Sequence, residues 1–76
     1  MKKKVTLDCL GLYCPLPLIK ATAKLKELEP GEILEIVSED ETVKRDFPHW
    51  CRKTGHIFLG IEEGEGIYRV YIRKGG

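Results

Sequence analysis

Two prolines, Pro15 and Pro17, constrain where the first helix of this chain can begin. Proline lacks a backbone N–H and breaks a helix interior, but the first turn tolerates it because amides there have no intrahelical partner. From Leu18, apolar residues recur at helical spacing until Pro30 and Gly31 break the pattern. The sequence therefore predicts a helix that starts at Pro15, with Pro17 at its third position.

A second helix is predicted in the middle of the chain, where apolar residues recur at helical spacing on both sides of Pro48. Deep inside a helix, this proline would cost about 3 kcal/mol. We therefore expect the regular helix to begin near Phe47, with Asp46 as its N-cap and residues 43–45 as a lead-in turn. Gly55 should end the helix, in the position that glycine favours.

Four other segments have the composition and alternation of strands. Residues 4–8 alternate apolar with polar side chains, and residues 33–38 are rich in β-branched ones. Residues 56–62 and 67–74 flank the polar turn 63–66 and are predicted to form a terminal antiparallel hairpin. Two apolar triplets should each share one face of their strand: Ile57, Leu59 and Ile61 in the first, and Tyr68, Val70 and Ile72 in the second.

The predicted element order is β-α-β-α-β-β, which indicates an α+β fold in a single domain spanning residues 1–76. Because a strand–helix–strand connection prefers a right-handed crossover, both helices should lie on one face of a four-stranded mixed sheet. The other face would then be uncovered, and apolar side chains on it could contact a partner. A domain of this size buries only about 60% of its unfolded surface, so its chemistry should lie near the surface.

The charge and composition exclude several classes of protein. A net charge of +1 lacks the basic excess of a nucleic-acid binder. No apolar segment approaches the roughly 20 residues that cross a membrane, and the segment after the opening MKKK is too polar for a signal peptide. Three cysteines are too few, and odd in number, for a disulfide scaffold. We expect a cytoplasmic monomer without a cofactor.

Cys14 is the main candidate for chemistry, because it lies directly before Pro15, at or next to the helix N-cap. A thiolate there is stabilised by the positive end of the helix dipole. The prolines remove two first-turn amides and leave those of Leu16 and Leu18, so only a modest lowering of the thiol pKa is expected. Gly11 permits a tight turn before the helix. The rigid prolines should hold the sulfur outward, where another protein's sulfur can reach it.

The run LDCLGLYCPLPLIKA resembles the TusA/SirA/YedF family of small sulfur-carrier proteins, whose signature is L-D-x-x-G-L-x-C-P-x-P. The segments PGE, SEDETVKRDFPHWC and YRVYIRKGG extend the resemblance over nearly the whole chain. It implies a two-layer β-α-β-α-β-β fold. It also implies that Cys14 takes sulfane sulfur as a persulfide, with Asp8, Gly11, Pro15 and Pro17 as the supporting motif.

In such a family, the partners would be a cysteine desulfurase or another persulfide donor, and a downstream acceptor protein. The resemblance leaves open whether the sulfur serves 2-thiolation of tRNA or another route, such as sulfur oxidation or thiosulfate assimilation. It also leaves open whether a carrier that needs partners should be called an enzyme of the sulfurtransferase type. A non-catalytic regulatory module remains an alternative, as does a carrier that forms a C-terminal thiocarboxylate on the closing Gly75–Gly76 pair.

The other cysteines have less specific settings. Cys9 could resolve a Cys14 persulfide by forming a disulfide, but burial in the strand is favoured because free cysteines are usually buried and inert. Cys51 should be a core or half-buried residue of the second helix. The spacings C-x4-C and C-x4-H, the latter completed by His56, offer four zinc ligands. The rigid loop and the position of Cys51 inside a helix argue against such a metal site.

Several charged residues are candidates for contacting a partner near the thiol. Lys20 and Lys24 share the outer face of the first helix, where either solubility or docking to an acidic surface explains them. Arg45 and Asp46 match family positions and could frame the same surface. Asp8 could orient loop amides, although its charge would oppose a nearby thiolate. His49 and His56 receive no general-base role.

Overall fold

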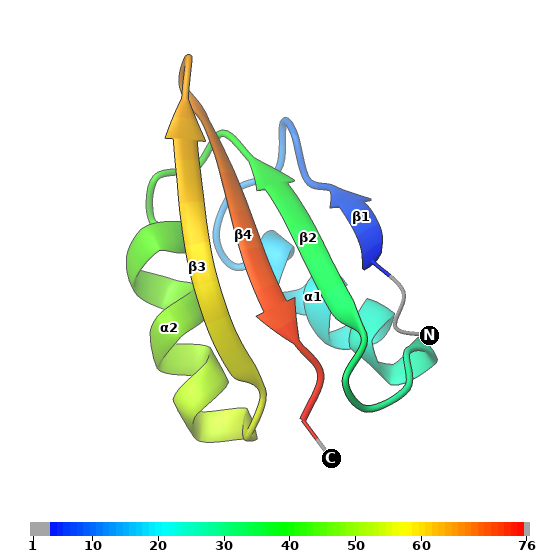
Figure 1. The fold of residues 1–76 in the computed structure, drawn as a ribbon. Coiled ribbons are helices and arrows are strands. Elements are labelled where there is room, and N and C mark those ends of the chain that lie inside the picture. The colour runs from blue at the N-terminus through cyan, green and yellow to red at the C-terminus, as the bar shows by residue number, and fades with distance from the viewer. Residues whose placement is uncertain (1–3, 76) are drawn as a thin grey trace.

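Two helices cover one face of a four-stranded sheet in the computed structural model, which describes residues 4–75 (Figure 1). The strands are β1 (Lys4–Asp8), β2 (Ile33–Ser38), β3 (Ile57–Gly64) and β4 (Ile67–Arg73), and the helices are α1 (Leu16–Glu27) and α2 (Val43–Thr54). The sheet order is β1-β2-β4-β3, with β1 parallel to β2 and the other pairs antiparallel. The predicted α+β fold and element order are confirmed. Residues 1–3 and 76 lie outside the described residues.

The core lies between the sheet and the helices. Leu34 and Ile36 of the central strand β2 pair with Ile72 and Val70 of β4, and all four are fully buried. The helices contribute Ala21, Leu25, Val43, Phe47 and Cys51 to the same cluster. Burial continues along β2 from Leu34 to Ser38 and includes the polar Glu35 and Ser38, so burial in this strand does not alternate with exposure.

Helix α2 begins four residues earlier than the sequence predicted, so the assignment of Asp46 as N-cap is wrong. Thr42 precedes the helix, Asp46 lies in its first turn, and Pro48 lies inside it. Val43 and Phe47, one helical turn apart, are both buried, and this packing offsets the backbone hydrogen bond that Pro48 cannot donate. Gly55 does end the helix, with a φ of 85° and its amide bonded to the Cys51 carbonyl.

Helix α1 begins one residue later than predicted. Pro15 occupies the N-cap position with non-helical backbone angles, Leu16 is the first helical residue, and Pro17 is the second rather than the third. Both prolines therefore lie at positions where a backbone N–H would have no partner within the helix, so its absence costs no hydrogen bond. Cys14 directly precedes the N-cap, as expected for a residue next to it.

A β-bulge in β3 changes the predicted alternation of the hairpin. The pairing of β3 with β4 shifts between Phe58 and Gly60, which leaves Leu59 as the extra residue. Phe58 and Ile61 therefore pack on the core, whereas Ile57 and Leu59 are 46% and 41% exposed. The prediction that Ile57, Leu59 and Ile61 share one face is wrong because the bulge reverses the inward side within the strand. The triplet of β4 is buried as predicted.

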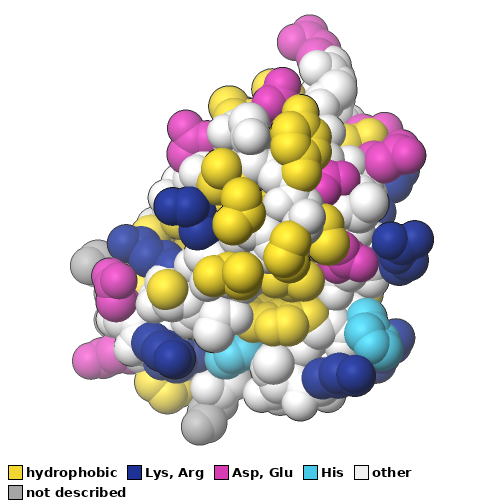
Figure 2. All heavy atoms as spheres, turned by 180° about the vertical axis from the view of Figure 1, so that it is seen from behind, with side chains coloured by type: hydrophobic (Ala, Val, Ile, Leu, Met, Phe, Trp, Pro, Cys, Tyr) yellow, Lys and Arg dark blue, Asp and Glu magenta, His cyan; other side chains and the backbone are white. Residues whose placement is uncertain are grey.

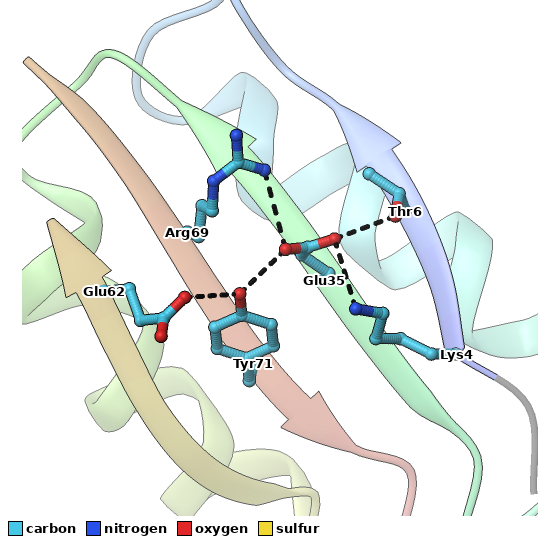
Figure 3. Close-up of polar contacts among 6 residues, drawn as sticks. All are labelled: Lys4, Thr6, Glu35, Glu62, Arg69 and Tyr71. Atoms are coloured by element: carbon cyan, nitrogen blue, oxygen red, sulfur yellow. Dashed lines mark hydrogen bonds and ion pairs between the residues drawn. The ribbon is translucent and has the colours of Figure 1, made fainter. Parts of the chain in front are cut away.

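The uncovered sheet face carries a polar network rather than the apolar surface that was expected (Figure 3). At its centre, Glu35 of β2 is only 6% exposed. Its carboxylate accepts hydrogen bonds from Thr6 at 2.9 Å and from Tyr71 at 2.8 Å. Lys4 and Arg69 approach the same carboxylate at 3.9 and 3.6 Å. These partners satisfy the charge of Glu35, so the open face stays polar without a covering layer.

This network predicts an acid-sensitive contribution to stability. The Tyr71 hydroxyl, together with Thr6, Lys4 and Arg69, lowers the pKa of Glu35. A lowered folded-state pKa stabilises the fold above the unfolded pKa of about 4.3, and this stabilisation is lost as the pH falls through the folded value. Glu35→Gln should therefore cost about 1.5–3 kcal/mol at pH 7 and less near pH 3. Urea unfolding across this pH range measures the difference.

The matched control for this prediction is Glu27→Gln. Glu27 is largely exposed and pairs with Lys24 on the surface of α1, so its replacement should change the unfolding free energy by at most about 0.5 kcal/mol. If Glu35→Gln costs no more than Glu27→Gln at pH 7, the network does not stabilise the fold.

Candidate functional site

Cys14 lies in the loop that joins β1 to α1, and the β1 edge of the sheet anchors the start of this loop. The Cys9 amide donates to the Val37 carbonyl at 2.8 Å and extends the parallel pairing beyond the last residue of β1. The chain then turns, with Gly11 at a φ of 79°, a conformation that side chains disfavour. The Cys14–Pro15 peptide bond is cis. The Cys14 side chain is exposed at the end of this turn.

Three carboxylates hold the amides of this loop. Asp8 accepts from the Leu10 amide at 2.9 Å, so its expected orienting contact with the loop is present. From the loop after β2, Glu39 accepts from the Gly11 amide at 2.9 Å, and Asp40 accepts from the Cys14 amide at 2.8 Å. The thiol loop is thus fixed by a side chain from the end of β1 and by two side chains from the loop after β2.

Sequence reasoning missed the positioning contacts of Glu39 and Asp40. The available signal was topological, because β1 and β2 are parallel neighbours and the loops after parallel strands meet at the same edge of a sheet. Asp40 is itself well held: its other oxygen accepts from the Thr42 amide at 3.0 Å, and its amide donates to the buried Ser38 hydroxyl at 3.0 Å. These contacts fix the carboxylate that holds Cys14.

The electrostatic environment of the Cys14 sulfur opposes ionisation, so the predicted modest lowering of its pKa is wrong. The neighbouring Asp46 carboxylate contributes most to raising the pKa of Cys14, the charge of Asp40 adds to this effect, and Arg45 lowers the pKa. The helix dipole does not compensate because the Leu16 amide donates to the Tyr13 carbonyl at 2.9 Å instead of the sulfur. The resting thiol is therefore held neutral at physiological pH.

Four large apolar side chains near Cys14 in the sequence are exposed. They form what we call the thiol-side patch: Leu10 (43% exposed), Tyr13 (58%), Leu16 (44%) and Ile19 (57%). The patch includes residues of the loop and the first turn of α1. Figure 2, which views the molecule from behind, shows hydrophobic side chains gathered in the middle of the helix-covered side, with charged groups around them. Apolar surface concentrated beside a reactive group is typical of an interaction site.

The other two cysteines are buried, and all three are free thiols. Cys9 is fully buried, and this burial raises its pKa. Burial also raises the pKa of Cys51 to about 11. The favoured burial of both residues is confirmed. Burial also argues against Cys9 as a resolving thiol, because an attacking sulfur must be accessible and ionised.

The described residues do not support the alternative of a zinc site formed by cysteines and His56. Among residues 4–75, no group of three or more His, Cys, Asp or Glu side chains is arranged to hold a metal ion. His56 instead accepts a hydrogen bond from the Gly75 amide at 3.1 Å and stacks on Trp50. Burial and the nearby Lys74 lower the pKa of His56. His49 is exposed on α2.

The candidate partner-contact residues are placed differently with respect to the thiol. Arg45 and Asp46 lie at the start of α2 beside Cys14 and pair with each other at 3.5 Å. Lys24 pairs with Glu27 at 3.4 Å, one turn along α1 and away from the loop. Lys20 is exposed on α1. Arg45 and Asp46 thus lie near the thiol, whereas Lys24 pairs with Glu27 farther along α1.

These features define a class of protein: a small two-layer α+β domain that exposes one cysteine at the entrance of a helix. The chain belongs to the family described as sulfurtransferase TusA, whose model matches residues 5–74. The sulfur carrier protein TusA of Pseudomonas entomophila is 39% identical over 69 residues, which cover 91% of this chain and 86% of that protein.

Two further comparisons extend the similarity in sequence and in fold. The YrkF protein of Bacillus subtilis is 42% identical over 76 residues, which are the whole of this chain but only 41% of that protein. A SirA-like protein from Desulfitobacterium hafniense has a crystal structure that matches with a TM-score of 0.80 at 27% identity, covering 95% of this chain and 99% of that one. The predicted membership of the TusA/SirA family is confirmed.

Proposed function

We propose that this chain is a sulfur carrier that accepts sulfane sulfur as a persulfide on Cys14 and passes it to a partner protein. The observation that carries this proposal is the contrast among three thiols. Cys14 alone is exposed, on a loop held by carboxylates from the end of β1 and from the loop after β2, in a chain of the TusA family. The buried Cys9 and Cys51 are inaccessible to another protein's sulfur.

Sulfur acceptance requires only a thiol exchange at the surface. The ionised Cys14 sulfur attacks the outer sulfur of a donor persulfide and forms a new S–S bond, while the S–S bond within the donor breaks. The donor cysteine leaves as a thiolate and takes up a proton, and Cys14 now carries the persulfide. Delivery to the acceptor is the same exchange, with this chain as the donor. No electrons are gained or lost overall.

The cavities of the molecule favour a protein partner over a small-molecule substrate. A cavity of about 390 Å³ lies at the β3–β4 hairpin, and one of about 130 Å³ lies between α1, His56 and Lys74. Cys14 lines neither of them.

Within residues 4–75, neither helix has the length and apolar composition needed to cross a bilayer.

The partners we propose are a cysteine desulfurase, or another persulfide donor, and a downstream acceptor protein in a cytoplasmic relay. Such a relay would lead to 2-thiolated tRNA or to another sulfur-transfer route, with this chain acting as a sulfurtransferase-type carrier. Free thiols at all three cysteines suit a reducing compartment. The Asp8, Gly11, Pro15 and Pro17 motif would position the thiol.

The test is sulfur loading followed by delivery. Incubation with a cysteine desulfurase and cysteine should add one sulfur mass to the intact chain, and a reductant should remove it. Loading should survive deletion of Gly75 and Gly76, because the proposed site is Cys14. If the chain instead exchanges one oxygen for one sulfur, and does so only when ATP, an adenylating enzyme and the two glycines are all present, the C-terminal thiocarboxylate route is correct. If the chain takes up no sulfur, the carrier proposal is wrong.

A further inference from the structure

Three charged side chains surround the Cys14 sulfur, and two of them are carboxylates. The Asp46 carboxylate is near enough to the thiol to raise the pKa of Cys14, and Asp40 adds its charge while it accepts a hydrogen bond from the Cys14 amide at 2.8 Å. We call these two residues the acid pair. The third is Arg45, whose side chain is 81% exposed and lies 3.5 Å from the Asp46 carboxylate. Arg45 therefore offsets the acid pair only in part, since an exposed ion pair in water is weak.

The acid pair sets a condition that a partner of this thiol must satisfy. The thiolate is the reactive form, yet two carboxylates disfavour it in the free chain. A positive charge brought to within about 5 Å would favour the thiolate by about fourfold even in bulk water, and by more once water is excluded. A partner that approaches with negative charge would oppose both its own docking and the ionisation of Cys14.

The thiol-side patch sets a second condition. Its four side chains are 43–58% exposed and flank Cys14 in the chain, from Leu10 to Ile19. The other exposed large apolar residues of the described chain, Ile57 and Leu59, lie on β3, the edge strand at the far side of the sheet from β1. A partner that covers the patch would exclude water from the sulfur and strengthen every charge interaction there.

We propose that the sulfur-exchanging partner of Cys14 is a protein that presents an apolar surface to the thiol-side patch and a cationic side chain to the acid pair, next to its own reactive sulfur. This inference rests on the proposed function and names the chemistry of the partner. The cation pairs with Asp46 and Asp40, and the thiol proton leaves to solvent. Docking thus activates a thiol that stays neutral in the free chain.

Charged disulfides test the electrostatic part without any partner protein. Cystamine carries positive charges, bis(2-hydroxyethyl) disulfide is neutral, and dithiodipropionate is negative. Each forms a mixed disulfide with Cys14 by thiol exchange, and intact-mass spectrometry gives the rate at pH 7. Relative to 2-mercaptoethanol as the attacking thiol, Cys14 should prefer cystamine over dithiodipropionate by about tenfold or more, and salt should reduce this preference.

Two neighbouring residues provide variants with opposite expected effects. Asp46→Asn removes a carboxylate and should reduce the preference for the cationic disulfide by several-fold. Arg45→Gln removes the competing cation and should increase it. If Cys14 shows the same preference as 2-mercaptoethanol, or if both variants shift it in the same direction, the acid pair does not select a cationic partner. Because this experiment uses no sulfur donor, its outcome is independent of the carrier proposal.

A matched pair of exposed apolar residues tests the thiol-side patch. Ile19→Asp places a charge within the patch, whereas Leu59→Asp places one on β3, and the two residues are 57% and 41% exposed. Ile19→Asp should slow loading by a cysteine desulfurase at least about tenfold, and Leu59→Asp should change it less than twofold. Equal effects would overturn the docking assignment. So would a wild-type dimer in sedimentation that Ile19→Asp dissociates, because a second copy would then cover the patch.

Failure of the carrier proposal is recognised separately. If the wild-type chain is never loaded with sulfur, the carrier function is wrong, while the disulfide series still reports whether the acid pair selects a cationic partner. If loading succeeds but the disulfide series shows no charge preference, the carrier function stands and this inference is wrong.

Discussion

Replacement of Cys14 by serine (Cys14→Ser) should abolish sulfur uptake and change the unfolding free energy by no more than about 0.5 kcal/mol. The side chain is exposed, so its replacement leaves no cavity and removes no core contact. A serine hydroxyl cannot hold a sulfur atom as a persulfide, so the loss should be complete rather than partial. Intact-mass spectrometry after incubation with a cysteine desulfurase and cysteine measures uptake, and urea unfolding measures stability.

The matched control is Cys51→Ala. Cys51 is 2% exposed and its pKa is raised to about 11 by burial, so it is neither accessible nor ionised near neutral pH. Its replacement should leave sulfur uptake at the wild-type level, at a modest cost in stability from the lost packing. Sulfur uptake that persists in Cys14→Ser, or that disappears in Cys51→Ala, would contradict the assignment of Cys14.

The element order was predictable because each element keeps one face on a single core. Leu34, Ile36, Val70 and Ile72 follow strand patterns, and all four are fully buried. Such periodicity survives in the sequence because burial depends on side-chain direction, which repeats regularly in strands and helices. The position of Cys14 next to the N-cap was predictable for a similar local reason, since prolines such as Pro15 and Pro17 are favoured in the first turn of a helix.

The two wrong predictions about helices and strands, the start of α2 and the inward face of β3, concern features that depend on contacts between different segments. The start of α2 at Val43 depends on the packing of that residue and Phe47, which outweighs the local cost of Pro48. The bulge at Leu59 depends on the register of β3 against β4. Neither is encoded in one short segment, so propensity and periodicity alone cannot reveal it.

The prediction of a lowered pKa for Cys14 was wrong for a different reason. The helix dipole is a local property, and it predicted a lowered pKa for Cys14. The groups that decide the direction, Asp40 and Asp46, are remote in sequence and reach the sulfur only after β2 and α2 pack beside the thiol loop. The same folding turns Asp46 from an expected helix cap into a contact of the thiol, a role that only the tertiary structure defines.

Phe47→Ala should cost the most stability of any single truncation proposed for this chain, about 3–5 kcal/mol. Phe47 is the largest fully buried side chain, and its ring packs edge-on against Trp50 with the centroids 5.8 Å apart. At about 0.05–0.15 kcal/mol per residue, a chain of 76 residues has a total stability of roughly 4–11 kcal/mol. Urea unfolding followed by the fluorescence of Trp50 measures the loss.

The control for this prediction is Leu59→Ala, which truncates an apolar side chain of similar size at the exposed bulge of β3. Because Leu59 is 41% exposed, its loss should change the unfolding free energy by about 0.5 kcal/mol or less. The large difference between the two variants follows from the same packing that allows α2 to begin before Pro48. If Phe47→Ala costs no more than Leu59→Ala, Phe47 does not anchor the helix, and the physical reason given for the early start of α2 is wrong.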